Sequence, residues 1–442
     1  MGHIKAFESR IDAPHGELSG ASRTILPPIS AYLVDFQLYR PGVTLAVLAG
    51  RMSDVTVSKV LPGRRVQFID AARGGAMFFV LLSHFGFTFF PNQFDLAPTI
   101  MRLVGMVASP TFIIINGLLF GFLYRTRVNN QDRFRAILVD RGLFLLTVGH
   151  LVILGSHVSS YTVRFLSITD TVGVCMIAGT WLVVRLDRRN RLLLSLALFG
   201  VSWLAIDNWQ PHAILAVAIK ETLFGSLTPT IYYYAFPLLP WFSLDLAASA
   251  LGDCLGVHYE NNDTATMRRV LLTTAASALT AAAALNAAAH MVRHYGFAMA
   301  ATAHVLASPF QKEPPSPVYF LFYGALGLFL IAAFMRLADG EYAPRLMTAA
   351  ASLGKTSFAV FVAQFYVYFT VLPFVRHHLP WSMPWGVWLP LSVLVILLPA
   401  LEWQRRGFNR FLTVGYLQSW RLRSRRESPP ALGMLERLSH TT

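Results

Sequence analysis

Long apolar runs separated by short polar segments fill the chain from residue 66 to about residue 402. Ten of them approach the roughly 20 residues that an α-helix needs to cross a bilayer. These runs lie near residues 70–92, 99–124, 136–157, 165–185, 190–206, 231–251, 270–290, 317–336, 350–374 and 386–402. The pattern predicts an all-α polytopic membrane protein built as a bundle of about ten transmembrane helices.

The remaining segments do not fit this pattern. Residues 1–65 are mixed in polarity and are predicted to form an N-terminal cytoplasmic or interfacial segment. Residues 66–410 form the transmembrane domain, and residues 411–442 form a basic tail. Within the domain, the segment 211–230 carries Lys220 and Glu221 at its centre. Because a buried charge is costly in a membrane, we expect a re-entrant or interfacial element there on the outer side.

Composition agrees with this interpretation. Of the 442 residues, 55 % are hydrophobic and only 14 % are charged, whereas soluble proteins carry about 25 % charged residues. A soluble enzyme, a DNA-binding factor and a disordered chain are therefore excluded as descriptions of the whole protein. The two cysteines supply neither a disulfide framework nor a Cys-rich metal site.

The net charge of +14 is concentrated in alternate loops, as in the basic segment 185–191. Positively charged loops stay in the cytoplasm, so this alternation predicts that both termini are cytoplasmic. The same distribution argues against a nucleic-acid partner, which would require a continuous basic patch.

The first predicted span carries Asp70, Arg73 and His84 on one helical stripe. At 100° per residue, Arg73 and His84 face within about 20° of each other and lie roughly 16 Å apart along the axis. Arginine binds oxyanions such as phosphate bidentately, and histidine titrates near neutral pH, as a general base must. We expect the imidazole to lie deep in the bilayer. The structural alternative is an Asp70–Arg73 ion pair and a His84 that only packs.

Other polar residues within or beside the spans are less specific. Asn116 stands beside Gly117, an arrangement that serves helix packing as often as ligand binding. The residues interpreted as structural are His150, His157, Asp170, Asp245, Asn286 and Gln364. Because no histidines show a metal-ligand spacing, no metal site is predicted.

Several motifs resemble those of membrane-bound acyltransferases, a superfamily that includes acyltransferase family 3 and the heparan-α-glucosaminide N-acetyltransferase-like proteins. Asp70-x-x-Arg73-Gly, with His84 eleven residues after the arginine, resembles their signature. Three stretches resemble further family motifs: Pro110–Leu119, in which Asn116 replaces a common serine, Phe236–Trp241, and Glu313–Phe320. The motif Leu353–Phe358 resembles the opening of a late span, although Gln364 stands where a histidine is frequent.

The resemblance covers roughly residues 64–410 and implies an acyltransferase of the bacterial inner membrane. It implies an acyl-CoA donor, usually acetyl-CoA, taken from the cytoplasm, and a sugar or glycolipid acceptor reached from the other side. Carried over to this chain, Arg73 and His84 are the pair essential for acyl transfer. Trp241, Lys355 and Gln364 become candidate residues for binding the donor or the acceptor.

The predicted mechanism assigns His84 as the base that deprotonates a sugar hydroxyl or amine. Arg73, oriented by Asp70, holds the donor phosphates together with Arg133, Arg135 and Arg141. Asn116 is a candidate donor to the oxyanion.

Three alternatives stay open. The first is a two-step route through an acyl-histidine. The second is a transporter or flippase that uses the buried Arg, His and Asp as a substrate or proton pathway. The third is a membrane scaffold or sensor. The sequence does not distinguish O- from N-acylation or acetyl from succinyl transfer.

Overall fold

The computed structural model describes residues 66–90, 95–126, 131–156, 165–229, 233–234, 236–294, 300–340, 343–378 and 384–408. The predicted N-terminal segment 1–65, the tail 411–442 and His157 lie outside the described residues.

Ten long helices dominate the described part of the chain. Eight of them are unbroken α-helices, namely α2 (Gln67–Phe89), α3 (Leu96–Thr126), α6 (Ile168–Arg185), α7 (Arg188–Asn208), α9 (Leu238–Glu260), α10 (Thr264–His294), α12 (Pro317–Asp339) and α16 (Trp385–Arg405). Two are composite, with a short π-helical segment inside: α4–η2–α5 (Gln131–Phe144, Leu145–Gly149, His150–Leu154) and α14–η3–α15 (Ser357–Tyr366, Val367–Val371, Leu372–His378). Within the described residues, all ten are long and apolar enough to cross a membrane, which confirms the predicted fold class.

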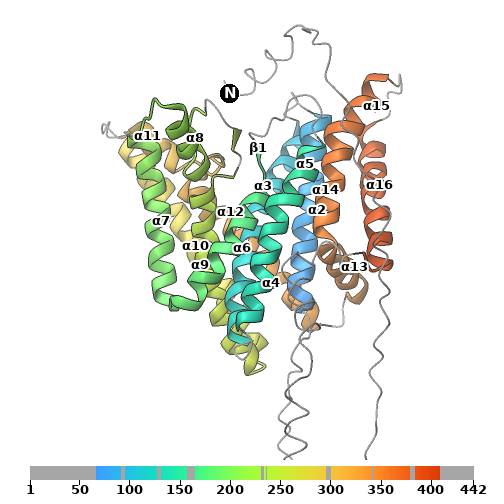
Figure 1. The fold of residues 1–442 in the computed structure, drawn as a ribbon, viewed down its shortest axis with the longest axis horizontal. Helices are drawn as coiled ribbons and strands as arrows, with labels where there is room; N and C mark the ends of the chain where they lie inside the picture. The colour runs from blue at the N-terminus through green and yellow to red at the C-terminus, as the bar shows by residue number, and fades with distance from the viewer. Residues whose placement is uncertain are drawn as a thin grey trace, which may run out of the picture. The chain divides into compact units, whose positions relative to one another are not determined.

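The other elements are short. They are the helices α8 (Ile214–Leu223), α11 (Ala300–Leu306) and α13 (Pro344–Lys355), and a parallel pair of two-residue strands, β1 (Phe165–Leu166) and β2 (Tyr233–Tyr234). Figure 1 shows α13 at one end of the helices and α5, α8, α11 and α15 at the other.

Four of the long helices form the centre of the bundle. Of their most apolar windows, 61–67 % is buried in α2, α3, α9 and α12, against 17 % in α10 and α16. Small residues let the central backbones approach closely: a Cβ at Gly117 of α3 would stand 2.1 Å from the carbonyl oxygen of Asp245 on α9. The outer helices accordingly turn apolar side chains outward, as a lipid-facing surface requires.

Basic residues gather at one end of the described helices. Arg125 stands in the last turn of α3, Arg185 ends α6, Arg188 begins α7 and Arg405 ends α16. We call this the arginine end, and it is the lower end in Figure 1.

Two sequence expectations are refined by the structure. The predicted span 350–374 is wrong in its start, because α13 ends at Lys355 and the spanning helix begins only at Ser357. Conversely, the segment 211–230 does not cross: α8 has ten residues, about 15 Å of helix. Its buried Lys220 amine donates to the Ile206 carbonyl at 3.2 Å and to the side chain of Gln210 at 3.1 Å.

Candidate functional site

Asp70 and Arg73 form an ion pair one turn apart near the start of α2. The guanidinium Nη1 lies 3.6 Å from Asp70 Oδ1, with the aspartate buried and the arginine half-buried. Helix α13 covers this turn, since a Cβ at Gly354 would stand only 1.7 Å from the Asp70 carbonyl oxygen. The pair predicted as the structural alternative is therefore present. It also fixes a guanidinium on the stripe that leads to His84.

His84 is held by a residue from a distant helix. Its Nδ1 lies 2.5 Å from Oε1 of Gln364, a fully buried side chain on α14. Because an amide oxygen only accepts, Nδ1 carries the proton and donates it, which leaves the lone pair of the neutral ring on Nε2. The rings of Phe365 and Phe369 stand edge-on to the imidazole at 5.5 and 5.3 Å. The contact therefore fixes both the tautomer and the orientation of the ring.

The predicted helical stripe is realised. Helix α2 is unbroken from Gln67 to Phe89, so Arg73 and His84 share a face about 16 Å apart. His84 stands five residues before the end of α2, about 7 Å along the axis. The imidazole thus lies nearer the end of α2 opposite the arginine end, and its depth in the bilayer stays a prediction.

Asn116 is paired with a carboxylate. Its amide Nδ2 donates to Oδ1 of Asp245 at 2.7 Å, and both side chains are buried between α3 and α9. One turn before Asp245 on α9, the indole nitrogen of Trp241 is buried with no hydrogen-bond partner within the described structure. In this structure the Asn116 amide donates to Asp245 and not to a substrate. Its role as an oxyanion donor stays a prediction.

Two motifs that lie far apart in the sequence pack against each other. Trp241 meets Phe320 with ring centroids 4.9 Å apart, and Tyr319 at 6.2 Å. The Lys312 ammonium lies 4.9 Å from the centre of the Phe236 ring. Burial lowers the pKa of Lys312, whereas the nearby Glu313 raises it. These contacts make Trp241 an anchor between α9 and α12.

The remaining predicted binding residues lie elsewhere. Arg135 stacks over Trp181 at 5.6 Å, and Arg141 is half-buried in α4. Lys355 is exposed at the end of α13, while the side chain of Arg133 lies outside the described residues. The described contacts thus join Asp70 to Arg73 on α2, and His84 on α2 to Gln364 on α14.

Sequence reasoning missed a second histidine pair. His150 Nδ1 lies 3.0 Å from Oδ1 of Asp170, whose other oxygen accepts from the Ser167 backbone at 2.8 Å. His150 follows the π-helical segment η2, and π-bulges are frequent at functional sites. The Ser167-x-x-Asp170 spacing of a capping box was the available signal for Asp170. Among the described residues, no three His, Cys, Asp or Glu side chains gather as a metal site.

A comparison with known protein families gives a match to the part of the chain that contains Arg73 and His84. Residues 65–274 match the family model described as heparan-alpha-glucosaminide N-acetyltransferase, catalytic. The match confirms the resemblance, with Arg73, His84, Asn116 and Trp241 inside the matched segment. The motifs around Glu313 and Lys355, and Gln364 itself, lie beyond it. No curated protein matches the chain.

Proposed function

We propose that the protein is an integral membrane acyltransferase in which His84 is the general base. It moves an acyl group, most simply acetyl, from acyl-CoA to a hydroxyl or amine of a cell-envelope glycan or glycolipid. The match to an acetyltransferase catalytic domain supports the reaction class. The observation that carries the role of His84 is its bond to the buried Gln364, which leaves Nε2 free of a proton.

The chemical step follows from that tautomer. Nε2 takes the proton of the acceptor O–H or N–H while the oxygen or nitrogen attacks the thioester carbonyl carbon. The new C–O or C–N bond forms, the C–S bond breaks, and the imidazolium returns its proton to the departing thiolate. Acylated acceptor and free CoA thiol are the products, and His84 is neutral again.

Arg73 is proposed to bind the phosphate groups of the donor, because a guanidinium fork fits phosphate bidentately. Asp70, 3.6 Å away, positions this guanidinium. The separation of about 16 Å between Arg73 and His84 suits a donor whose phosphates and thioester lie at opposite ends of the long pantetheine arm. Arg135, Arg141 and Arg133 remain candidate helpers, and Lys355 a candidate donor contact.

The positions of the arginine end and of His84 along the helices support acyl transfer across the membrane. The positive-inside rule places the arginine end in the cytoplasm, where acyl-CoA is found. His84 then stands near the outer surface, within reach of an acceptor that arrives from that side. This arrangement separates donor entry from acceptor entry and leads us to propose the cytoplasmic membrane of a bacterium as the location.

Release of free CoA thiol from acetyl-CoA tests the proposal. Purified protein is mixed with a panel of sugar acceptors, and wild type is compared with His84→Ala. Loss of a general base is expected to lower turnover by about 10²–10⁴-fold, while binding of acetyl-CoA persists. His290→Ala, which removes an exposed histidine from α10, is the matched control and should keep full activity.

Two outcomes would contradict the proposal. If wild type releases no thiol from acetyl-CoA or succinyl-CoA with any acceptor but moves a substrate across vesicles, the protein is a transporter. If His84→Ala retains full turnover, the acyltransferase stands without His84 as its base, and the His150–Asp170 pair becomes the next candidate.

A further inference from the structure

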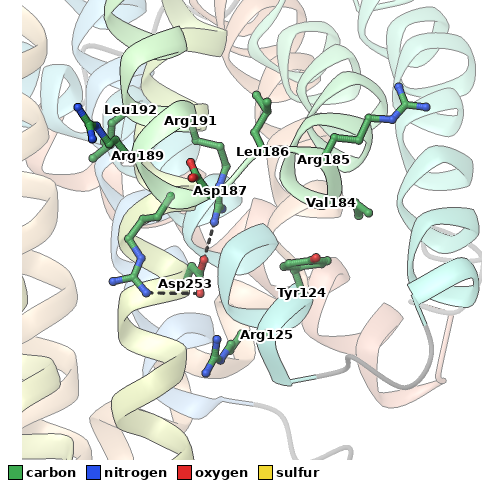
Figure 2. A pocket seen from close by; sticks show the side chains of 11 residues that line it. Tyr124, Arg125, Val184, Arg185, Leu186, Asp187, Arg189, Arg191, Leu192 and Asp253 are labelled. Carbon is green, nitrogen blue, oxygen red and sulfur yellow. Dashed lines mark hydrogen bonds and ion pairs between the residues drawn. The ribbon is translucent and has the colours of Figure 1, made fainter.

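A basic groove opens at the arginine end, away from His84. Its volume is about 790 Å³, within the range of small-molecule sites. It is bordered by the ends of α3, α6 and α7 and by Asp253 of α9, and Figure 2 shows Asp253 between Arg191 and Arg125. Its lining residues are Tyr124, Arg125, Val184, Arg185, Leu186, Asp187, Arg188, Arg189, Arg191, Leu192 and Asp253.

Positive charge exceeds negative charge in this lining. Five arginines face two aspartates. Asp253 is already engaged by the buried Arg191 at 2.5 Å and by Arg188 at 3.9 Å, and Asp187 caps α7 by accepting from the Asn190 backbone. Arg125 is also paired with Glu260 at 3.5 Å. Arg185 and Arg189 therefore supply the excess of guanidinium groups in the groove, which favours an anionic ligand with several oxygens, such as phosphate.

Buried and aromatic side chains contact the arginines of the groove. Arg191 is 1 % exposed, and its guanidinium also donates to the Ser249 carbonyl at 3.0 Å. Arg185 stacks over the ring of Trp181 at 5.2 Å, and Arg135 approaches the same ring at 5.6 Å. Tryptophan at a helix end beside arginine is typical of the membrane–water interface, so the groove opens at the depth of lipid headgroups.

The outer wall of the groove continues into an apolar surface. Leu192 lines the groove and is 44 % exposed, and Leu193 and Leu196 further along α7 are 53 % and 70 % exposed. A phospholipid uses both features, because its headgroup would enter the groove while its acyl chains follow α7.

The groove is also distant from His84. Gly105 of α3 lies against Ser83, next to His84, because a Cβ at Gly105 would stand 2.0 Å from the serine oxygen. Tyr124 is nineteen residues further along α3, about 28 Å towards the arginine end. Neither Arg73 nor Gln364 lines the groove.

We propose that this groove is a binding site for the phosphate headgroup of an anionic phospholipid. Basic pockets between transmembrane helices on the cytoplasmic side bind such headgroups, and the combined charge, depth and apolar wall fit one. The site does not depend on the proposed acyltransferase chemistry and would exist in a transporter as well.

Native mass spectrometry of the purified full chain, titrated with phosphatidylglycerol or phosphatidylcholine, tests the site. The variant Arg185→Gln/Arg189→Gln removes two groove charges and leaves the Arg191–Asp253 ion pair intact. We expect wild type to prefer phosphatidylglycerol and the variant to bind it about tenfold or more weakly. The matched control Arg405→Gln/Arg406→Gln removes two arginines from α16 at the same end and should bind as wild type.

Each other outcome contradicts the proposal. Equal binding of the two lipids by wild type, or an equal loss in the α16 control, would leave only a general surface effect. Displacement of phosphatidylglycerol by free CoA would assign the groove to a soluble phosphate ligand instead. An unchanged thermal melting temperature in both double variants shows that binding, and not folding, is measured.

Discussion

The contact between His84 and Gln364 makes a prediction at the scale of one hydrogen bond. Gln364→Leu removes the acceptor at Nδ1 and releases the tautomer and orientation of the ring. A hydrogen bond of this kind contributes roughly 1 kcal/mol, so we expect kcat to fall about fivefold while KM for acyl-CoA stays unchanged. Gln364→Glu keeps an acceptor oxygen and should restore most of kcat. If Gln364→Leu and Gln364→Glu have equal activities, Gln364 only packs.

Residue spacing predicted one half of this site and missed the other. Asp70, Arg73 and His84 share one helix, so helical geometry alone placed them on a stripe. Gln364 lies 280 residues from His84, and only a resemblance made it a candidate. The Asn116–Asp245 and His150–Asp170 pairs were missed for the same reason. Each joins two helices, and the relative rotation of packed helices is not written in the period of either one.

At the scale of elements, the crossing of α2 and α13 depends on a small residue at Gly354. A Cβ there would stand 1.7 Å from a backbone oxygen of α2, which cannot rotate away. We expect Gly354→Ala to destabilise the protein by about 1–3 kcal/mol, as overpacking does, and to lower activity through the displaced Asp70–Arg73 pair. Thermal unfolding in detergent measures the loss. Gly200→Ala on α7 is the control, since a Cβ there has open space and should not destabilise.

Helix α13 also shows why the element boundaries were only partly predictable. The apolar residues from Leu346 to Phe374 read as nearly continuous in the sequence. The structure breaks this run at Thr356, where the backbone leaves helical geometry with φ −100° and ψ 8° and α13 ends. Hydrophobicity thus located the span, whereas the change of backbone conformation that separates two helices at Thr356 was not visible in it.

At the scale of the whole chain, the two ends of the described helices differ chemically: one is rich in arginine, and His84 lies near the other. The loops and helix termini at the arginine end carry Arg125, Arg185, Arg188 and Arg405, and the composition of the loops was enough to predict this grouping. An even number of crossings returns the chain to the side on which it started. If the arginine end is cytoplasmic, His84 faces the opposite compartment, and acyl transfer there requires the donor to reach through the bundle.

The sidedness itself can be measured with single cysteines in a Cys175→Ser/Cys254→Ser background. Asn190→Cys places an exposed thiol at the arginine end, and Phe310→Cys places one before α12 at the other end. In intact cells, a membrane-impermeant maleimide should label the thiol at position 310, and the thiol at 190 only after lysis, because positively charged loops remain inside. Labelling of position 190 in intact cells would reverse the orientation. The groove and Arg73 would then lie on the side that lacks acyl-CoA, and the proposed entry of the donor would fail even if the reaction class held.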